Sequence, residues 1–486
     1  MSPIIMGKNI ETLLFPPFER RNLHRLVLFT IIILLGYLVM TGRLMMVIIL
    51  ITLAWSVWLA YRQPIFIAGL AVLQSIDFFR LIPSETLIKW QLGPGFRINT
   101  LDAIVLLSLP LAIVRLLERK EKPLFVGPVS LILGVTFLNM GLGLAFGTTN
   151  LDSSMGFLRT IFYYTAYFVL VSAIDSPRRL RQWIGFLFAI FLVSVVFQLV
   201  EAIIGQRLTL GLGEYYVYTS DSRLLVGGYQ VMYLWNRAAL LAFLVLFLGL
   251  GALFQGRQLK WYWFISTLGI GSLLLAFVRQ WYVYLGIGIL TLLMIQAKRR
   301  IRNLIFIVLI ILFLLGLLMV MSPVLQNAFG PSFLQAWFAR IDSLIHFQTA
   351  TNFIVRVQII EAQWDMFLQS PLLGYGLSPI FGEVRSSDTG ITNTLVQFGL
   401  LGLGAILVLI VSFLRHAFRL RQQEAPSVQQ GYVSGLLALW ICVIIGSFFS
   451  VNYFTGKEGI WMVVIILALL DRLHAFLPRR VVQEKI

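Results

Sequence analysis

The sequence lacks the residues that build disulfide frameworks and most metal centres. Only one cysteine and four histidines occur among its 486 residues. The cysteine, Cys442, lies inside an apolar stretch, and no spacing among the histidines is typical of metal ligands. A disulfide-stabilised fold is therefore excluded, and neither a metal nor another cofactor is expected.

Charged residues are also scarce. They make up 12% of the chain against 59% hydrophobic residues, and the mean hydropathy is +0.89. A soluble globular protein carries about twice that charged fraction, so an ordinary soluble domain is excluded. In a soluble protein the formal net charge of +17 would suggest nucleic acid as a partner. Here the orientation of membrane spans explains most of that charge, and no nucleic acid is expected.

The chain instead contains apolar runs of about 20 residues, each long enough to cross a bilayer. They predict an all-α polytopic integral membrane protein with about fourteen transmembrane helices. The predicted spans are residues 25–41, 44–61, 64–79, 101–116, 127–146, 158–175, 183–204, 238–255, 261–277, 281–297, 303–321, 391–414, 432–450 and 459–471. Glu11 and Glu19 precede the first run, which is typical of a cytosolic amphipathic lead-in and not of a cleaved signal peptide.

Basic residues orient these spans in the bilayer. With the N-terminus in the cytosol, about 25 of the 38 Lys and Arg residues fall in cytosolic segments and about 13 on the other side. An even number of spans then leaves both termini in the cytosol. The predicted organisation is a lead-in over 1–24, spans 1–11 over 25–321, a large outer loop over 322–390, spans 12–14 over 391–471 and a cytosolic tail over 472–486.

Three long segments fall outside the membrane in this topology, namely residues 80–100, 205–237 and 322–390. The last is the longest, and a long loop between spans is usually functional or disordered. Its sequences "FLQAWFARIDSLIHF" and "FIVRVQIIEAQWDMFL" have helical periodicity and are too apolar for a disordered segment. We expect this loop to fold over the outer face of the bundle.

The second loop helix carries one polar stripe. At helical spacing Asn352, Arg356 and Gln363 share a face, while Glu361 and Asp365 point the opposite way. A polar stripe with a single cation is suited to an anionic ligand. The alternative is an exposed loop helix whose arginine pairs with an acid.

Arg279 interrupts a run of about 36 apolar residues, which is enough for two spans with almost no connection between them. It must lie at or near the outer boundary of the membrane. An ionisable group there is a candidate functional residue. The alternative is an interfacial arginine that extends to water.

Arginines recur on the outer side of the membrane in this topology, with Arg159 and Arg237 at the outer ends of two further spans. The five are Arg159, Arg237, Arg279, Arg356 and Arg385. Convergence above one bundle would suit a strongly anionic substrate such as a pyrophosphate. Arg159, Asn236 and Arg237 can also be only interfacial anchors.

Asp388 lies directly before the predicted span 391–414. Asp is a preferred helix N-cap, and sequence physics alone favours that role. The same position would let its carboxylate accept a proton from an attacking hydroxyl. The two roles are compatible.

Glycines lie before and after the segment that contains Asp388. Gly374 and Gly376, around Tyr375, predict a tight turn, either under a substrate or as an ordinary turn. Three glycines in the next span read most simply as helix-packing residues. They are Gly399, Gly402 and Gly404.

The order of these features resembles the O-antigen polymerase and O-antigen ligase superfamily of bacterial membrane glycosyltransferases. The family pattern runs from an Arg through a short helix to "sPl-G-x-G", then to a His- or Asp-led segment and "G-l-x-G". Here it reads Arg356, "QSPLLGYG" and "SSDTGITNTLVQFGLLG", with Asp388 at the position held by His in ligases. Upstream, "AFVRQW" is similar to the family's Ser-Arg motif, with Val278 in place of the Ser, and "LWNRAALLAF" to its Asn-led span.

The resemblance implies a GT-C-like helical glycosyltransferase in the bacterial plasma membrane. Its substrates would be a polyprenyl-pyrophosphate-linked glycan donor and a glycan acceptor at the outer face, with metal-independent, inverting transfer. Arg356 and Arg279 would hold the pyrophosphate, and Asp388 would orient or deprotonate the acceptor hydroxyl. The remaining substrate-binding candidates are Arg159, Asn236, Arg237, Tyr375 and Arg385. A chain-length regulator or a flippase is a possible protein partner.

Other functions remain open at this point. The absence of the ligase His favours a polysaccharide polymerase over a ligase that moves finished glycan to another acceptor. A solute transporter should carry ionisable groups or broken helices near mid-membrane, and these spans have almost no acids at that depth. A non-catalytic polysaccharide-export partner is a third alternative. Trp337, Trp364 and Tyr375 are candidates for stacking on a sugar, although each is more simply a packing residue.

Overall fold

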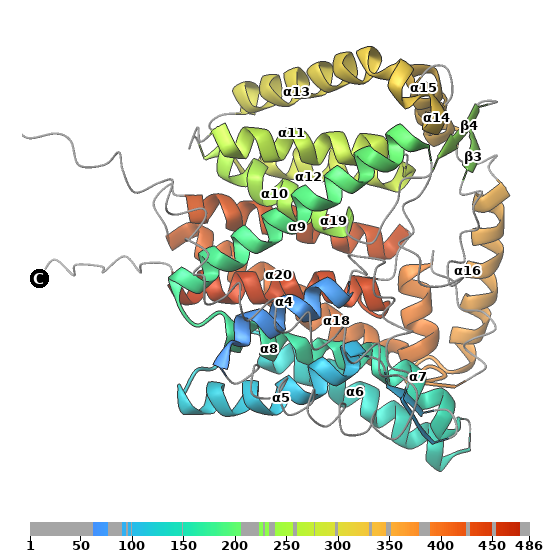
Figure 1. The fold of residues 1–486 in the computed structure, drawn as a ribbon. Coiled ribbons are helices and arrows are strands. Elements are labelled where there is room, and N and C mark those ends of the chain that lie inside the picture. Colours follow the sequence, from blue (N-terminus) through green and yellow to red (C-terminus); the bar gives the residue numbers. More distant parts are fainter. Residues whose placement is uncertain are drawn as a thin grey trace, which may run out of the picture.

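A computed structural model of the chain is almost entirely helical (Figure 1). It describes residues 62–75, 90–93, 96–98, 100–147, 149–205, 223–226, 229–232, 239–255, 260–276, 278–296, 300–329, 333–346, 351–378, 389–423, 428–449 and 453–476. The predicted lead-in, the first two predicted spans and most of the predicted tail lie outside the described residues.

Most helices lie roughly side by side, and α16 crosses their ends (Figure 1). The N-terminal part contains α4 (Pro64–Ser75), β1 (Trp90–Gly93), β2 (Phe96–Ile98), α5 (Thr100–Glu118), α6 (Val126–Ala145), α7 (Leu151–Phe162), the 3-10 helix η1 (Tyr163–Thr165), α8 (Ala166–Ala173) and α9 (Pro177–Ile204). Then follow β3 (Arg223–Val226), β4 (Tyr229–Met232), α10 (Ala239–Phe254), α11 (Lys260–Leu275), α12 (Arg279–Ile295) and α13 (Arg300–Val320). The C-terminal part contains α14 (Ser322–Phe329), α15 (Phe333–Ile345), α16 (Thr351–Gln369), α18 (Gly390–Gln423), α19 (Val428–Phe449) and α20 (Lys457–Phe476).

The helices have the dimensions of membrane spans. Within the described residues, seven helices are long and apolar enough to cross a membrane by length and composition. Three shorter apolar helices accompany them, at Pro64–Leu73, Leu241–Phe254 and Arg279–Ile295. The chain is therefore a multi-pass helical membrane protein, and the count of fourteen spans stays a prediction.

Local sequence signals set where a helix begins and ends, as α9 illustrates. Ser176 caps its first turn by accepting a hydrogen bond from the Arg179 N–H at 3.3 Å, and Pro177 occupies the first helical position. The helix ends at Gly205, which adopts the left-handed conformation that suits glycine.

Helix α10 forms the centre of the bundle. Every side chain from Leu241 to Phe254 is buried, as expected of a helix that is apolar on all sides. Gly431 and Gly435 of α19 face it, and a Cβ on Gly435 would lie 2.1 Å from the Phe247 carbonyl oxygen. Small residues four apart thus let the two backbones touch, which is a common packing mode of membrane helices.

Two short antiparallel hairpins accompany the helices. Strand β1 pairs with β2, and β3 pairs with β4 in a register that places Val226 opposite Tyr229. The residues between β3 and β4 in the sequence are Gly-Gly, a pair typical of two-residue hairpins. Both hairpins fall in segments predicted to lie outside the membrane, where a strand edge is not exposed to lipid.

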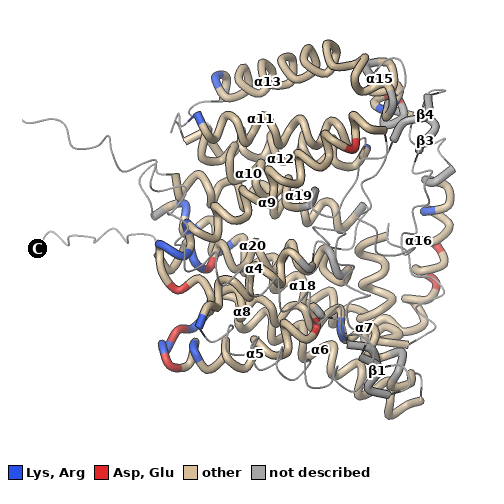
Figure 2. Tube along the Cα trace, viewed as in Figure 1, with Lys and Arg blue, Asp and Glu red and all other residues tan. Residues whose placement is uncertain are grey.

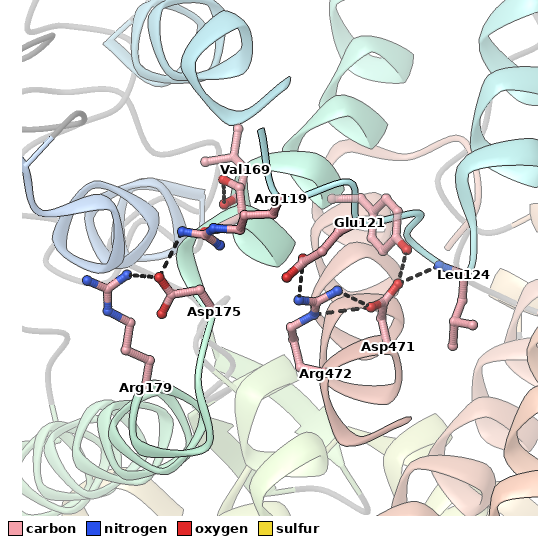
Figure 3. Close-up of polar contacts among 10 residues, drawn as sticks. Arg119, Glu121, Leu124, Val169, Asp175, Arg179, Asp471 and Arg472 are labelled. Atoms are coloured by element: carbon pink, nitrogen blue, oxygen red, sulfur yellow. Dashed lines mark hydrogen bonds and ion pairs between the residues drawn. The ribbon is translucent and has the colours of Figure 1, made fainter. Parts of the chain in front are cut away.

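Charged side chains gather at one end of the bundle (Figure 2). This "charged end" contains residues 115–122, 175–181, 415–422 and 471–474. The opposite end, crossed by α16, is the "α16 end". At the charged end, Asp175 accepts hydrogen bonds from Arg119 at 2.8 Å and Arg179 at 2.7 Å (Figure 3).

A second network at the charged end is centred on the buried side chains of Asp471 and Arg472 (Figure 3). One oxygen of Asp471 accepts hydrogen bonds from the Leu124 N–H at 2.6 Å and from the Tyr167 hydroxyl. The other oxygen accepts from Arg472 at 2.6 Å, and Arg472 also donates to Glu121 at 3.0 Å. The network ties α20 to α8 and to the connection between α5 and α6.

Candidate functional site

The candidate site lies at the α16 end, where helix α16 presents the polar face predicted from its sequence. Gln363 is fully buried and Arg356 is half-buried, while Glu361 and Asp365 are exposed. The side chain of Asn352 lies outside the described part. The described members of the stripe therefore face the bundle, and the two acids face away from it.

Buried amides fix α16 against the beginning of α18. The Gln363 amide nitrogen donates to the Asn393 side-chain oxygen at 2.7 Å, and the Thr392 hydroxyl donates to the Gln363 oxygen. Phe367 packs in the same contact with Leu395. Each buried donor and acceptor needs a hydrogen-bond partner, so this contact sets the register between the two helices.

A tight turn follows α16, as the glycines predict. Gly374 has φ +67° and Gly376 has φ +62°, a conformation that side chains rarely adopt. The Gly374 N–H donates to the Ser370 carbonyl at 2.9 Å, and the Ser370 hydroxyl donates to the Gly374 carbonyl at 2.8 Å. The turn therefore closes on its own backbone.

Helix α18 is broken at Gly399, which has φ +61° and ψ −159°. The break leaves backbone groups without partners inside the helix, and the preceding turn supplies them. The Tyr375 N–H donates to the Val396 carbonyl at 2.8 Å, and the Leu400 N–H donates to the Pro371 carbonyl at 2.9 Å. The turn and the break thus form one unit, the "turn–break junction" of residues 370–376 and 396–401.

The junction corrects the interpretation of Gly399 as a helix-packing residue. A Cβ on Gly399 would lie 2.4 Å from the Leu372 carbonyl oxygen, and one on Gly374 would lie 2.7 Å from the Gly399 nitrogen. Gly404, also expected to pack, has nothing within 4 Å of its Cβ position. Gly399 is required by its own conformation and by a backbone that approaches it, whereas Gly404 is not.

Replacing Gly399 by alanine is expected to lower the free energy of unfolding by roughly 2–3 kcal/mol. Its dihedral angles are almost confined to glycine, and the added methyl group would collide with the Leu372 carbonyl. The matched control is Gly404→Ala, which should be neutral or slightly stabilising. Thermal unfolding in detergent compares the two variants, and equal melting temperatures would contradict the role given to Gly399.

The junction is also held from the side of α6 and α7. The Thr149 hydroxyl donates to the Leu377 carbonyl at 2.9 Å and lies 3.0 Å from the Ser154 hydroxyl. A Cβ on Gly376 would lie 3.4 Å from the Asn139 carbonyl oxygen of α6. Contacts from α6, from the connection between α6 and α7, and from α16 and α18 therefore converge on this turn.

Arg159 of α7 is already engaged by an acid that the sequence analysis missed. Its Nε lies 2.9 Å from one oxygen of Asp102 and 3.1 Å from the other. The Tyr163 hydroxyl donates to the same carboxylate at 2.6 Å. Asp102 is buried at the start of α5, and an acid in the first turn of a span was the available signal. The charge of Arg159 is thus largely balanced before any ligand binds.

Arg279 is the first residue of α12, directly after the short connection predicted from α11. A cation at a helix N-terminus opposes the preference of the helix dipole. The positive charge of Arg279 and the positive N-terminal end of the α12 dipole together form a favourable environment for an anion. Helix α15, which carries the basic residue Arg340, packs against α12.

Some of the other predicted site residues have defined contacts, and the rest lie outside the described residues. The Tyr375 hydroxyl donates to the Gln369 side chain at 2.7 Å. Trp337 packs between Tyr282 and Phe338. Asn236, Arg237, Arg385 and Asp388 lie outside the described residues.

Arg159 and Arg279 come from different groups of helices. Helix α7 packs against α6, η1 and α20, whereas α12 packs against α11, α13, α15 and α19 (Figure 1). The two arginines therefore lie on helices with different main packing partners. The described part of the chain contains no group of three His, Cys, Asp or Glu side chains arranged to hold a metal ion.

A comparison with known protein families gives a match over this region. Residues 264–407, less than a third of the chain, match the family model described as O-Antigen ligase. No curated protein matches the chain. The matched segment begins in α11 and ends in α18 beyond the break, so it includes Arg279, Arg356 and the whole turn–break junction, while Arg159 lies before it. Residues 264–407 are thus similar to the O-antigen ligase family.

Proposed function

We propose that the protein is a glycosyltransferase of the bacterial plasma membrane that takes its glycan from a polyprenyl pyrophosphate. The observation that carries this proposal is the family match, because it spans the two arginines at the α16 end and the turn–break junction. Basic residues favour the cytosol, so the charged end is assigned to the cytosolic side. The reaction then takes place at the outer face of the membrane, with both termini in the cytosol.

The residues at the α16 end suit the chemistry of this transfer. The acceptor hydroxyl oxygen bonds to the anomeric carbon as the bond from that carbon to the pyrophosphate oxygen breaks, which inverts the centre. The lipid pyrophosphate leaves with an additional negative charge. Arg279 and Arg356 are assigned to that charge, since arginine binds phosphate through a charged, bidentate fork.

Asp388 is assigned to receive the proton of the acceptor hydroxyl. It precedes Gly390, the first residue of α18, by two positions in the sequence. The first part of α18 is fixed on one side by the Gln363–Asn393 hydrogen bond and at its other end by the turn–break junction. A residue attached to so rigid a half-helix is well suited to a role that depends on position.

Within the superfamily we favour the polymerase branch, in which donor and acceptor are both lipid-linked repeat units. The reason is Asp388 at the position where ligases carry His. A ligase is the second candidate, in agreement with the description of the matched family. A chain-length regulator or a flippase fits either branch as a partner.

A transporter is disfavoured by the environment of the broken helix. Transporters use such breaks to expose backbone groups to a substrate cavity. Here the break at Gly399 is covered by the turn, whose backbone takes up the freed groups of Val396 and Leu400. The arrangement supports a rigid scaffold more than a moving gate.

The product pattern tests the proposal. Purified protein in lipid nanodiscs is given a polyprenyl-pyrophosphate-linked oligosaccharide, and the products are separated on a gel. A ladder of repeats is expected from a polymerase. Single transfer that requires a second lipid acceptor would assign the protein to the ligase branch. No product with any lipid-linked donor would leave a transporter or an export partner as the explanation.

A further inference from the structure

Helix α16 has a third face that neither the junction nor the arginines use. Between its buried face and its two exposed acids runs a stripe of apolar side chains at spacings of three and four residues, the positions that share one side of a helix. Trp364 is 47% exposed and Leu368 is 58% exposed, and Val357 and Ile360 extend the stripe toward the N-terminus of α16. A continuous exposed apolar surface of this kind marks a contact with lipid, ligand or protein.

The stripe continues into the membrane-facing side of α18. Leu372 is 65% exposed and lies four residues after Leu368, in the turn that follows α16. Its carbonyl accepts a hydrogen bond from the Leu401 N–H at 3.2 Å, so the junction places it beside Leu400 and Leu401, which are also exposed.

From that point the exposed side of α18 carries further apolar side chains along the span, among them Leu407, Val408 and Val411. In a span, an exposed apolar side faces the lipid. The apolar surface therefore runs from the membrane across the junction onto α16, and we call the part formed by residues 400, 401, 372, 368, 364 and 360 the "apolar track".

Arg356 supplies a positive charge at the end of the track that lies farthest from α18. Arg356 precedes Ile360 by one helical turn and is the only basic residue of α16. Glu361 and Asp365 border the track on its exposed side and repel an anion there. The ligand that matches this arrangement is an amphiphile with a long apolar chain and an anionic head that binds at Arg356.

We infer that the apolar track holds the polyisoprenyl chain of the lipid-linked donor and directs its pyrophosphate to Arg356. The inference rests on the proposed function and names a binding surface for one part of its substrate. On α16 the track is one side chain wide, which fits a single isoprenoid chain better than the paired chains of a phospholipid. Because α16 crosses the helix ends, the chain would bend out of the bilayer as its head reaches the arginine (Figure 1).

Donors with two chain lengths test the inference. The variant Trp364→Gln with Leu368→Gln is compared with wild type in nanodiscs, using one glycan on a long or on a short, water-soluble polyisoprenyl pyrophosphate. The double variant should raise KM for the long-chain donor about tenfold and leave kcat and the KM for the short-chain donor unchanged. Val355→Gln is the matched control, because Val355 is an exposed apolar residue on another side of the same helix.

Two kinetic outcomes would overturn the inference. An unchanged KM for the long chain would show that the track does not bind it. An equal rise for both donors would show that the stripe only holds α16 in place.

A photoreactive polyisoprenyl pyrophosphate without glycan separates this inference from the proposed function, because labelling needs no turnover. Labelling of residues 360–372 in wild type, reduced in the double variant, is expected even if no glycan is transferred. Equal labelling by a photoreactive phospholipid would identify bulk lipid as the occupant and overturn the inference. Wild-type protein that is labelled but transfers no glycan would contradict the proposed function alone.

Discussion

Replacing Arg279 or Arg356 by alanine is expected to slow glycan transfer about 100-fold or more, because a single lost donor to a developing anion costs that much in other enzymes. The two residues occupy different kinds of position. Arg279 adds its charge to the N-terminus of α12, and Arg356 lies on the bundle-facing side of α16. Initial rates with a polyprenyl-pyrophosphate-linked donor in nanodiscs measure the effect.

Lysine substitutions and a distant arginine complete this test. Arg279→Lys and Arg356→Lys keep the charge but lose the bidentate fork, so intermediate rates are expected. Arg178→Ala removes an exposed arginine at the charged end and should leave the rate unchanged. Full activity in both alanine variants, with the proteins inserted and monodisperse, would refute the assignment of the pyrophosphate to these arginines.

Much of the fold could be predicted from sequence because its signals are local. An apolar run of span length identifies a membrane helix wherever it packs, and the 3.6-residue period of "FIVRVQIIEAQWDMFL" was enough to predict α16 and the side that carries Arg356 and Gln363. The short connection before Arg279 followed from run length alone. These features depend on a residue and its near neighbours.

The turn–break junction could not be predicted in this way. Glycines in a span usually allow helix packing, and Gly431 and Gly435 do so here. Gly399 differs only because the backbone of residues 371 and 372 approaches it, and no local pattern reveals that approach. The Gly-Gly pair before β4, in contrast, was a readable hairpin signal in a segment treated only as a loop.

Buried ion pairs were missed for a similar reason. An acid near the end of a span can be solvated, capped or paired, and the partner of Asp102 lies on another helix, at Arg159. Asp471 and Arg472 lie next to each other at the predicted end of the last span, where a solvated pair is the ordinary expectation. Their burial depends on the connection between α5 and α6, which lies far away in the sequence.

Removing Asp471 is expected to lower the free energy of unfolding by about 3–5 kcal/mol, the usual cost of breaking a buried ion pair by deleting one partner. The side chains of Asp471 and Arg472 are each only 3% exposed. In Asp471→Ala the Arg472 guanidinium retains only Glu121 as an acidic partner. The Tyr167 hydroxyl and the Leu124 N–H lose their shared acceptor. Equilibrium unfolding in mixed detergent micelles measures the loss.

Asp175→Ala is the matched control at the same end of the bundle. Asp175 also bridges two basic residues, but its side chain is 22% exposed and those of Arg119 and Arg179 are 30% exposed. Water can replace the lost contacts there, so a cost of about 1 kcal/mol or less is expected. Similar losses in the alanine variants of Asp471 and Asp175 would contradict the importance given to burial.

A double variant separates the cost of an unpaired charge from the value of the pair itself. Asp471→Asn keeps an acceptor for Tyr167 and Leu124 but leaves Arg472 without its closest counter-charge. Adding Arg472→Met removes that charge and retains an apolar chain of similar length beside Phe476. If desolvation dominates, the double variant should be more stable than Asp471→Asn alone. If it is less stable, the ion pair itself stabilises the contact between α20 and the connection that precedes α6.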